Sequence, residues 1–140
     1  LLRLALGYPG EAAERDLLAG SDRRELIAGT SPRLTVDEVL AARRAVNAVH
    51  ASDALIGYVQ ALLSRSRKHP GVRVGLSPRA GLALLRSARA YAMLLGRVHV
   101  LPEDVQALFG AVAAHRLVAD ADAGSDATLA KAILHAVPVD

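Results

Sequence analysis

The chain has no cysteine and no tryptophan, and aromatic residues make up only 3% of its 140 residues. Without cysteine it has neither a disulfide framework nor a thiolate metal site, which fits a reducing compartment, and we expect a cytoplasmic protein. No apolar run reaches the roughly 18–20 residues that a membrane-spanning helix needs. Leucine, alanine and valine must build the core, and because alanine and leucine favour helices we expect an all-α fold.

Acidic residues are missing between Ala54 and Pro102. The same stretch carries eight basic residues, which are Arg65, Arg67, Lys68, Arg73, Arg79, Arg86, Arg89 and Arg97. A positive zone of this kind can meet phosphates, nucleic acid or an acidic partner surface. A solvated face that is balanced by acids folded nearby explains the same pattern.

Several catalytic signatures are missing as well. The sequence has no GxxxxGK[ST] phosphate loop and no GxSxG nucleophile elbow. No two of its five histidines are three or four residues apart, so we expect no helical metal site. The 140 residues by themselves are therefore not expected to be an enzyme.

Apolar spacing predicts a helical bundle with short connections. The substantial helices are expected at 35–49, 52–68, 78–95 and 102–119, with a short helix at 11–18 and a small final one at 128–137. Thr35 and Glu38 form a capping box, and Ser52 precedes the next helix. In the helix over 35–49 the predicted apolar stripe consists of Val39, Ala42, Val46 and Val49. Residues 72–76 are interpreted as a short loop.

The first residues do not fit a helical bundle. Leu1 to Tyr8 is predicted to be a short strand, ended by the turn residues that follow it. One strand needs partners that the rest of this chain does not supply, so we interpret it as the end of something longer. Residues 21–34 are polar and broken by Gly29 and Pro32, which predicts a linker with one helical turn around 24–28.

The stretch from Gly75 to Gly81 opens the longest predicted helix. Ser77 can cap it, and Pro78 suits its first position, where a missing N–H has no cost. Arg79 is then at the second position, where its charge meets the positive end of the helix dipole at a cost of roughly 0.3–1 kcal/mol. The side chain either extends into solvent or faces an anion such as a phosphate together with the free N–H groups. Gly96 is expected to end the helix.

These segments, in this order, resemble the C-terminal part of MoxR-family AAA+ ATPases. The segments that carry the resemblance are Arg67-Lys68-His69-Pro70, Gly75-Leu76-Ser77-Pro78-Arg79-Ala80, Leu82 to Ala90, Gly96 to Val105, His115-Arg116-Leu117 and Ala136-Val137-Pro138-Val139. Leu1 to Pro9 is similar to the last strand of the family's ATPase core. Two positions depart from the pattern, because Leu101 stands where the family often has a Ser or Thr cap and residues 21–34 match poorly.

The resemblance implies a division of the chain and a role for one arginine. Residues 1–20 would be a remnant of the ATPase core, 21–34 a linker and 35–140 a helical lid domain. Arg79 would be the sensor 2 residue, directed at the γ-phosphate of ATP, with Ser77 and Pro78 supporting it. ATP and Mg²⁺ would be bound in the full-length parent, an ATPase whose Walker motifs precede Leu1.

The resemblance also implies partners. Rings of such ATPases couple ATP hydrolysis to chaperone-like remodelling of client proteins, commonly with von Willebrand factor A-type partner proteins. Two other readings of the residues stay open. One is a basic helical domain that binds nucleic acid, although the helix over 78–95 has no Asn or Gln for base contacts. The other is a non-catalytic helical module that binds another protein.

Overall fold

Helices make up most of the protein in the computed structural model, which describes residues 1–20, 22–121 and 124–139. The first position of the predicted linker and the last position of the predicted lid domain lie outside these residues. The α-helices are α1 (Glu11–Ala19), α2 (Arg23–Ala28), α3 (Val36–Ala48), α4 (Asp53–Lys68), α5 (Pro78–Leu94), α6 (Pro102–Ala113) and α7 (Asp126–His135). The predicted all-α class is confirmed.

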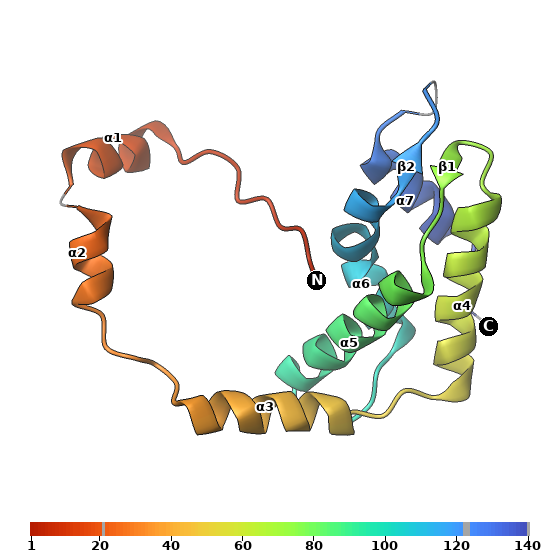
Figure 1. Cartoon of the computed structure of the whole chain (residues 1–140), viewed down its shortest axis with the longest axis horizontal. Helices are drawn as coiled ribbons and strands as arrows, with labels where there is room; N and C mark the ends of the chain where they lie inside the picture. The colour runs from red at the N-terminus through yellow and green to blue at the C-terminus, as the bar shows by residue number, and fades with distance from the viewer. Residues whose placement is uncertain (21, 122–123, 140) are drawn as a thin grey trace.

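The core lies where α4, α5, α6 and α7 meet (Figure 1). Leu62, Phe109 and Ile133 are completely buried there, and Leu84 on α5 is almost so. Ala88 and Ala92 on α5 are also completely buried. Their small side chains allow neighbouring helices to pack closely against α5. A core of small and medium side chains follows from the scarcity of aromatic residues, and burial of this apolar surface stabilises the bundle.

The predicted helix starts are confirmed by their caps. Thr35 accepts a hydrogen bond from the Glu38 N–H at 3.2 Å, and the Glu38 carboxylate accepts one from the Thr35 N–H at 2.6 Å. Ser52 accepts a bond from the Leu55 N–H in the same way. At the end of α5, Gly96 has a φ of +74°, which is the left-handed conformation that a glycine adopts without strain.

Two predicted boundaries are wrong because the structure forms a small sheet. Residues 72–76 were expected to be a loop, but Val72–Val74 is strand β1, which pairs antiparallel with β2 (Val118–Ala119). The helix expected over 102–119 ends at Ala113 and is followed by the 3₁₀ turn η1 (Ala114–Arg116). Leu117 is buried directly after this turn, and the pairing satisfies backbone groups that would otherwise lack partners.

The predicted strand over 1–8 does not form, and residues 1–10 carry no regular secondary structure. The N-terminal end of this arm lies beside the bundle, and the arm then runs away from it to α1 (Figure 1). The Arg3 N–H donates to the Ala111 carbonyl at 2.9 Å, and Arg116 Nη2 donates to the Leu1 carbonyl at 3.0 Å. A β-strand needs a neighbouring strand to pair with, and no strand among the described residues pairs with residues 1–8.

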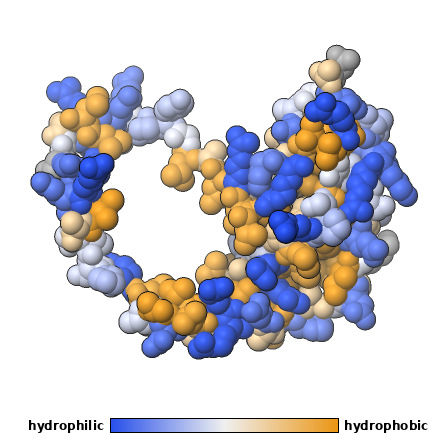
Figure 2. Space-filling model, in the orientation of Figure 1, coloured by the Kyte–Doolittle hydropathy of each residue, from blue (hydrophilic) through white to orange (hydrophobic). Residues whose placement is uncertain are grey.

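Helices α1, α2 and α3 contain no buried residue. The predicted turn around 24–28 is confirmed as α2, and the predicted helix over 11–18 as α1. The expected apolar stripe of α3 is not buried, because Val39 is 44% exposed and only Val49, at the C-terminal cap, enters the core. Hydrophobic side chains are visible along these helices in Figure 2. No described helix is both long and apolar enough to cross a membrane.

Candidate functional site

The loop that leads into α5 is held against α4 by two side chains. Ser66, which is completely buried, accepts a hydrogen bond from the Leu76 N–H at 2.9 Å and donates to the Leu63 carbonyl at 2.7 Å. Arg67 Nε donates to the Leu76 carbonyl at 2.8 Å. Both backbone polar groups of Leu76 are therefore satisfied from α4, which sets the point at which α5 begins.

Two glycines allow this close approach. A Cβ atom at Gly75 would lie 2.7 Å from Arg67 Cα and 2.8 Å from its backbone nitrogen. A Cβ atom at Gly81 would lie 2.7 Å from Leu63 Cδ1. Distances this short do not occur between real Cβ atoms and their neighbours. At Gly75 the overlap is with the backbone of α4, so a side chain there has no room, whereas at Gly81 the Leu63 side chain would have to move.

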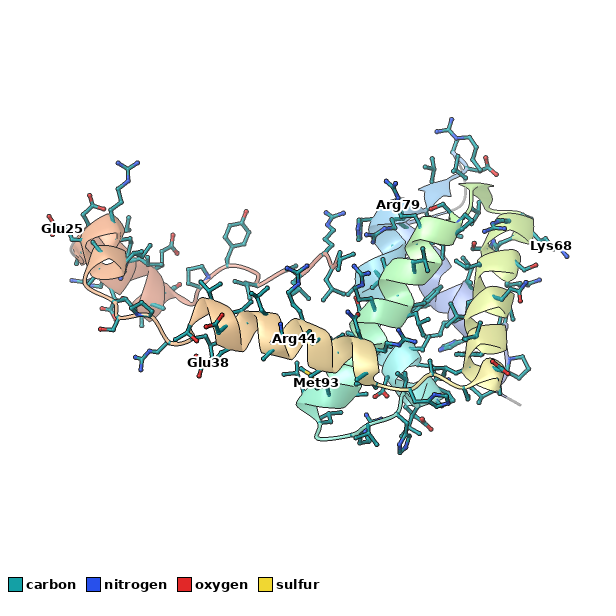
Figure 3. The ribbon with its side chains drawn as sticks, turned by 60° about the horizontal axis from the view of Figure 1, so that its bottom comes forward. Glu25, Glu38, Arg44, Lys68, Arg79 and Met93 are labelled. Carbon is teal, nitrogen blue, oxygen red and sulfur yellow. The ribbon has the colours of Figure 1, made fainter. Side chains whose placement is uncertain are left out.

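The start of α5 has the predicted geometry. Ser77 accepts a hydrogen bond from the Ala80 N–H at 3.3 Å, and Pro78 is the first helical residue. Arg79 is therefore the second helical residue, and the first turn contains no acidic residue. Figure 3 shows Arg79 at the N-terminal end of α5, and its side chain is exposed.

Arg79 lines a groove of about 550 Å³ together with two other arginines. Arg86 comes from the same helix, and Arg116 comes from η1. The remaining lining residues are small, apolar or hydroxylic: Leu1, Val74, Gly75, Ser77, Ala80, Leu82 and Ala83. Three arginines thus line the groove, and there is no carboxylate among the described residues that line it. The sequence placed Arg79 and Arg86 on one face but did not connect either to Arg116.

Arg116 is anchored by neutral acceptors. It donates to the carbonyls of Val112 and Leu1, and its Nη1 lies 2.6 Å from His115 Nε2. The pKa of His115 is lowered, mainly because burial penalises the charged imidazole and also because of the positive charge of Arg116. A neutral His115 can accept this hydrogen bond, and none of the three acceptors carries a negative charge that would offset the charge of Arg116.

The one ion pair among the described residues is away from the groove lining. Arg97 binds the Asp104 carboxylate with both terminal nitrogens, at 2.7 and 2.5 Å, and Asp104 is 2% exposed. Asp104 also accepts a bond from the Leu101 N–H at 2.8 Å, so it caps α6 where Leu101 has no capping side chain. Hydrogen bonding by Arg97 holds the pKa of Asp104 below its usual range. This pair was not predicted from the sequence, although an aspartate at the third helical position was a usable signal.

The buried Ser66 was also missed. It lies four residues after Leu62 on the apolar face of α4, and a lone hydroxyl at such a position needs a hydrogen-bond partner. The histidines form no cluster, and no three His, Cys, Asp or Glu side chains gather in the described ranges as a metal site would require. His50 and His99 are nevertheless neighbours in an isolated parallel bridge, which their sequence separation did not predict.

Comparison with known proteins identifies the family. Residues 64–136 match the AAA lid domain family. The chain is 31% identical over 137 residues to the uncharacterized protein YeaC of Bacillus subtilis, covering 98% of this chain and 43% of that protein. It is 32% identical over 139 residues to chaperone MoxR1 of Mycobacterium tuberculosis, covering 90% of this chain and 35% of that protein.

Two further matches agree with these. Over 46 residues, or 33% of this chain and 14% of the relative, the identity to protein MoxR of Paracoccus denitrificans is 52%. A solved structure of a candidate ATPase from Cytophaga hutchinsonii has the same fold, with a TM-score of 0.81 and 24% identity over 99% of this chain and 46% of that one. The chain spans less than half the length of these relatives. It belongs to the MoxR-family AAA+ ATPases and contains their AAA lid domain.

Proposed function

We propose that this chain senses the nucleotide state of a MoxR-type ATPase, and that Arg79 is the residue that contacts the γ-phosphate of ATP. The observation that supports this role is the placement of Arg79 at the positive end of α5, in a groove with Arg86 and Arg116 and no described carboxylate. A cation at this end of a helix is unfavourable by itself, and an anion placed there would be favoured by both the guanidinium and the helix dipole.

The groove fits only part of what ATP and Mg²⁺ require. Guanidinium groups suit phosphate oxygens, whereas Mg²⁺ is bound by carboxylates and phosphates. The described residues that line the groove supply no carboxylate. The metal and most of the nucleotide would thus be held by an ATPase core. We propose that residues 1–20 belong to this core, that 21–34 connect it to the lid, and that 35–140 form the lid domain.

In this proposal ATP binding draws Arg79 towards the core, and hydrolysis releases it, so the lid changes its position with the nucleotide. The motion would serve an oligomeric ring that remodels client proteins in the cytoplasm, with von Willebrand factor A-type proteins as partners. The name of the Mycobacterium tuberculosis relative, chaperone MoxR1, supports a chaperone-like role.

The test is the replacement of Arg79 by alanine in the full-length protein. We expect ATP turnover to fall by about tenfold or more, because a phosphate-directed arginine stabilises charge during hydrolysis. Stability should hardly change, since Arg79 is exposed and forms no ion pair among the described residues. Arg65→Ala is the matched control, because Arg65 is also exposed but does not line the groove. Equal turnover for the two variants would refute the role of Arg79.

A further inference from the structure

We propose that the groove beside Arg79 takes a chain of phosphates rather than a single phosphate, and that Arg86 is the second contact with this chain. The inference rests on the proposed function, because it assigns Arg79 to one end of the same anion. It adds a specificity-determining residue, since Arg86 would make the groove prefer an oligophosphate over orthophosphate.

The spacing on α5 supports two separate contacts. Arg86 lies seven residues after Arg79, so the two residues are on one face and about 10.5 Å apart along the helix axis. Side chains on a helix lean towards its N-terminus, which directs Arg86 along the face on which Arg79 lies. Both residues line the same groove. A phosphate at the first turn of α5 would contact Arg79, and a further phosphate along the same face of the helix would contact Arg86.

The charges around Arg86 also favour an anion. Arg86 is exposed, and no described residue forms an ion pair or a hydrogen bond with its guanidinium. It also lines the neighbouring groove of about 530 Å³, whose other polar residues are Arg43, Asn47, Ser87 and Tyr91. No described carboxylate lines either groove. Four arginines therefore line the two neighbouring grooves, and a concave surface with one sign of charge concentrates counter-ions.

Arg89 offers a control on the same helix. It lies three residues after Arg86 and is half-buried, yet it lines neither groove. Replacing it removes the same charge from the same helix without changing the groove. The comparison between Arg86 and Arg89 therefore separates direct contact with the anion from a general loss of positive charge, which acts over a Debye length of about 10 Å at 0.1 M salt.

The experiment titrates the 140-residue chain with inorganic tripolyphosphate and with orthophosphate at low salt, following NMR signals of α5 and of the core. We expect tripolyphosphate to bind more tightly. Arg86→Gln should weaken tripolyphosphate binding by about fivefold or more and change orthophosphate binding by less than about twofold, because a charge-assisted contact is lost from only one of the two anions. Arg79→Gln should weaken the binding of both anions, and Arg89→Gln should weaken both by less than about twofold, through the general loss of charge alone. Unchanged core signals will show that each variant is folded.

Three results would overturn the inference. If Arg86→Gln behaves like Arg89→Gln while Arg79→Gln still weakens binding, the second contact is wrong and the role of Arg79 stands. If Arg86→Gln weakens both anions equally, Arg86 contributes only general charge and does not select an oligophosphate. If Arg79→Gln changes neither affinity, the groove does not hold a phosphate chain between Arg79 and Arg86 and the inference fails, whereas the proposed function is decided separately by ATP turnover of Arg79→Ala in the full-length protein.

Discussion

Gly75 is the position at which the link between packing and the candidate site can be tested most sharply. Replacing it by alanine places a Cβ atom 2.7 Å from Arg67 Cα, so the overlap is with the backbone of α4 and no side-chain rotation relieves it. Overpacking of this kind costs about 1–3 kcal/mol. Moving the loop to relieve the overlap would also strain the two hydrogen bonds that hold Leu76, each with a net contribution of about 0.5–1.5 kcal/mol.

Gly57→Ala is the matched control for this substitution. Gly57 lies within α4, and a Cβ atom there would have no neighbour within 4 Å. Because alanine is the better helix former, this variant should be more stable by roughly 0.5–1 kcal/mol. The assay is urea unfolding of the chain followed by circular dichroism. We expect Gly75→Ala to unfold at lower urea than the parent chain and Gly57→Ala at higher urea. A Gly75→Ala variant as stable as the parent would refute the argument that α4 leaves no room for a side chain.

Two further predictions concern polar groups of the core. Ser66→Ala removes the acceptor of the buried Leu76 N–H and should lower the free energy of unfolding by about 1–3 kcal/mol, measured by urea unfolding. Ser64→Ala is the control, because it removes no hydrogen bond between described residues and should leave the stability unchanged. Equal stability of the two variants would contradict this prediction. The pKa of Asp104 is lowered in the folded chain, so its contribution to stability is present above the unfolded pKa of about 3.9 and is lost as pH falls through the folded value. Asp104→Asn should therefore be less stable than the parent at pH 7 and lose less stability between pH 5 and 2, and identical pH profiles for the two proteins would contradict this.

The positions of the helices could be predicted from the sequence because their signals are local. A cap joins residues that are three apart, as Thr35 and Glu38 are, and it has the same geometry whatever the helix later contacts. The pair Ser77-Pro78 and the glycine at 96 acted in the same way at the two ends of α5. The odd placement of Arg79 on this helix was also visible, because it follows directly from the position of the cap.

The remaining features join residues that are far apart in the sequence. The β1–β2 pairing connects residues 72–74 with 118–119, and the sequence of neither segment predicts which segment it pairs with. The spacing of apolar residues in α3 predicts a stripe on one face, but a stripe cannot show whether another element covers it, and here Val39 stays exposed. The reason for Gly75 is the backbone of Arg67, which only the packing of the loop on α4 reveals.

The candidate site likewise has some features that follow from local sequence and others that depend on tertiary structure. The sequence by itself determined where α5 begins and that Arg79 and Arg86 share its face, because helix geometry depends only on the residues within the helix. Only the tertiary structure decided that Arg116 joins them and that the groove has no carboxylate among the residues described there. The physical reason is that caps and periodicity act over one or two turns, whereas a binding groove is formed by side chains that chain folding brings together from distant segments.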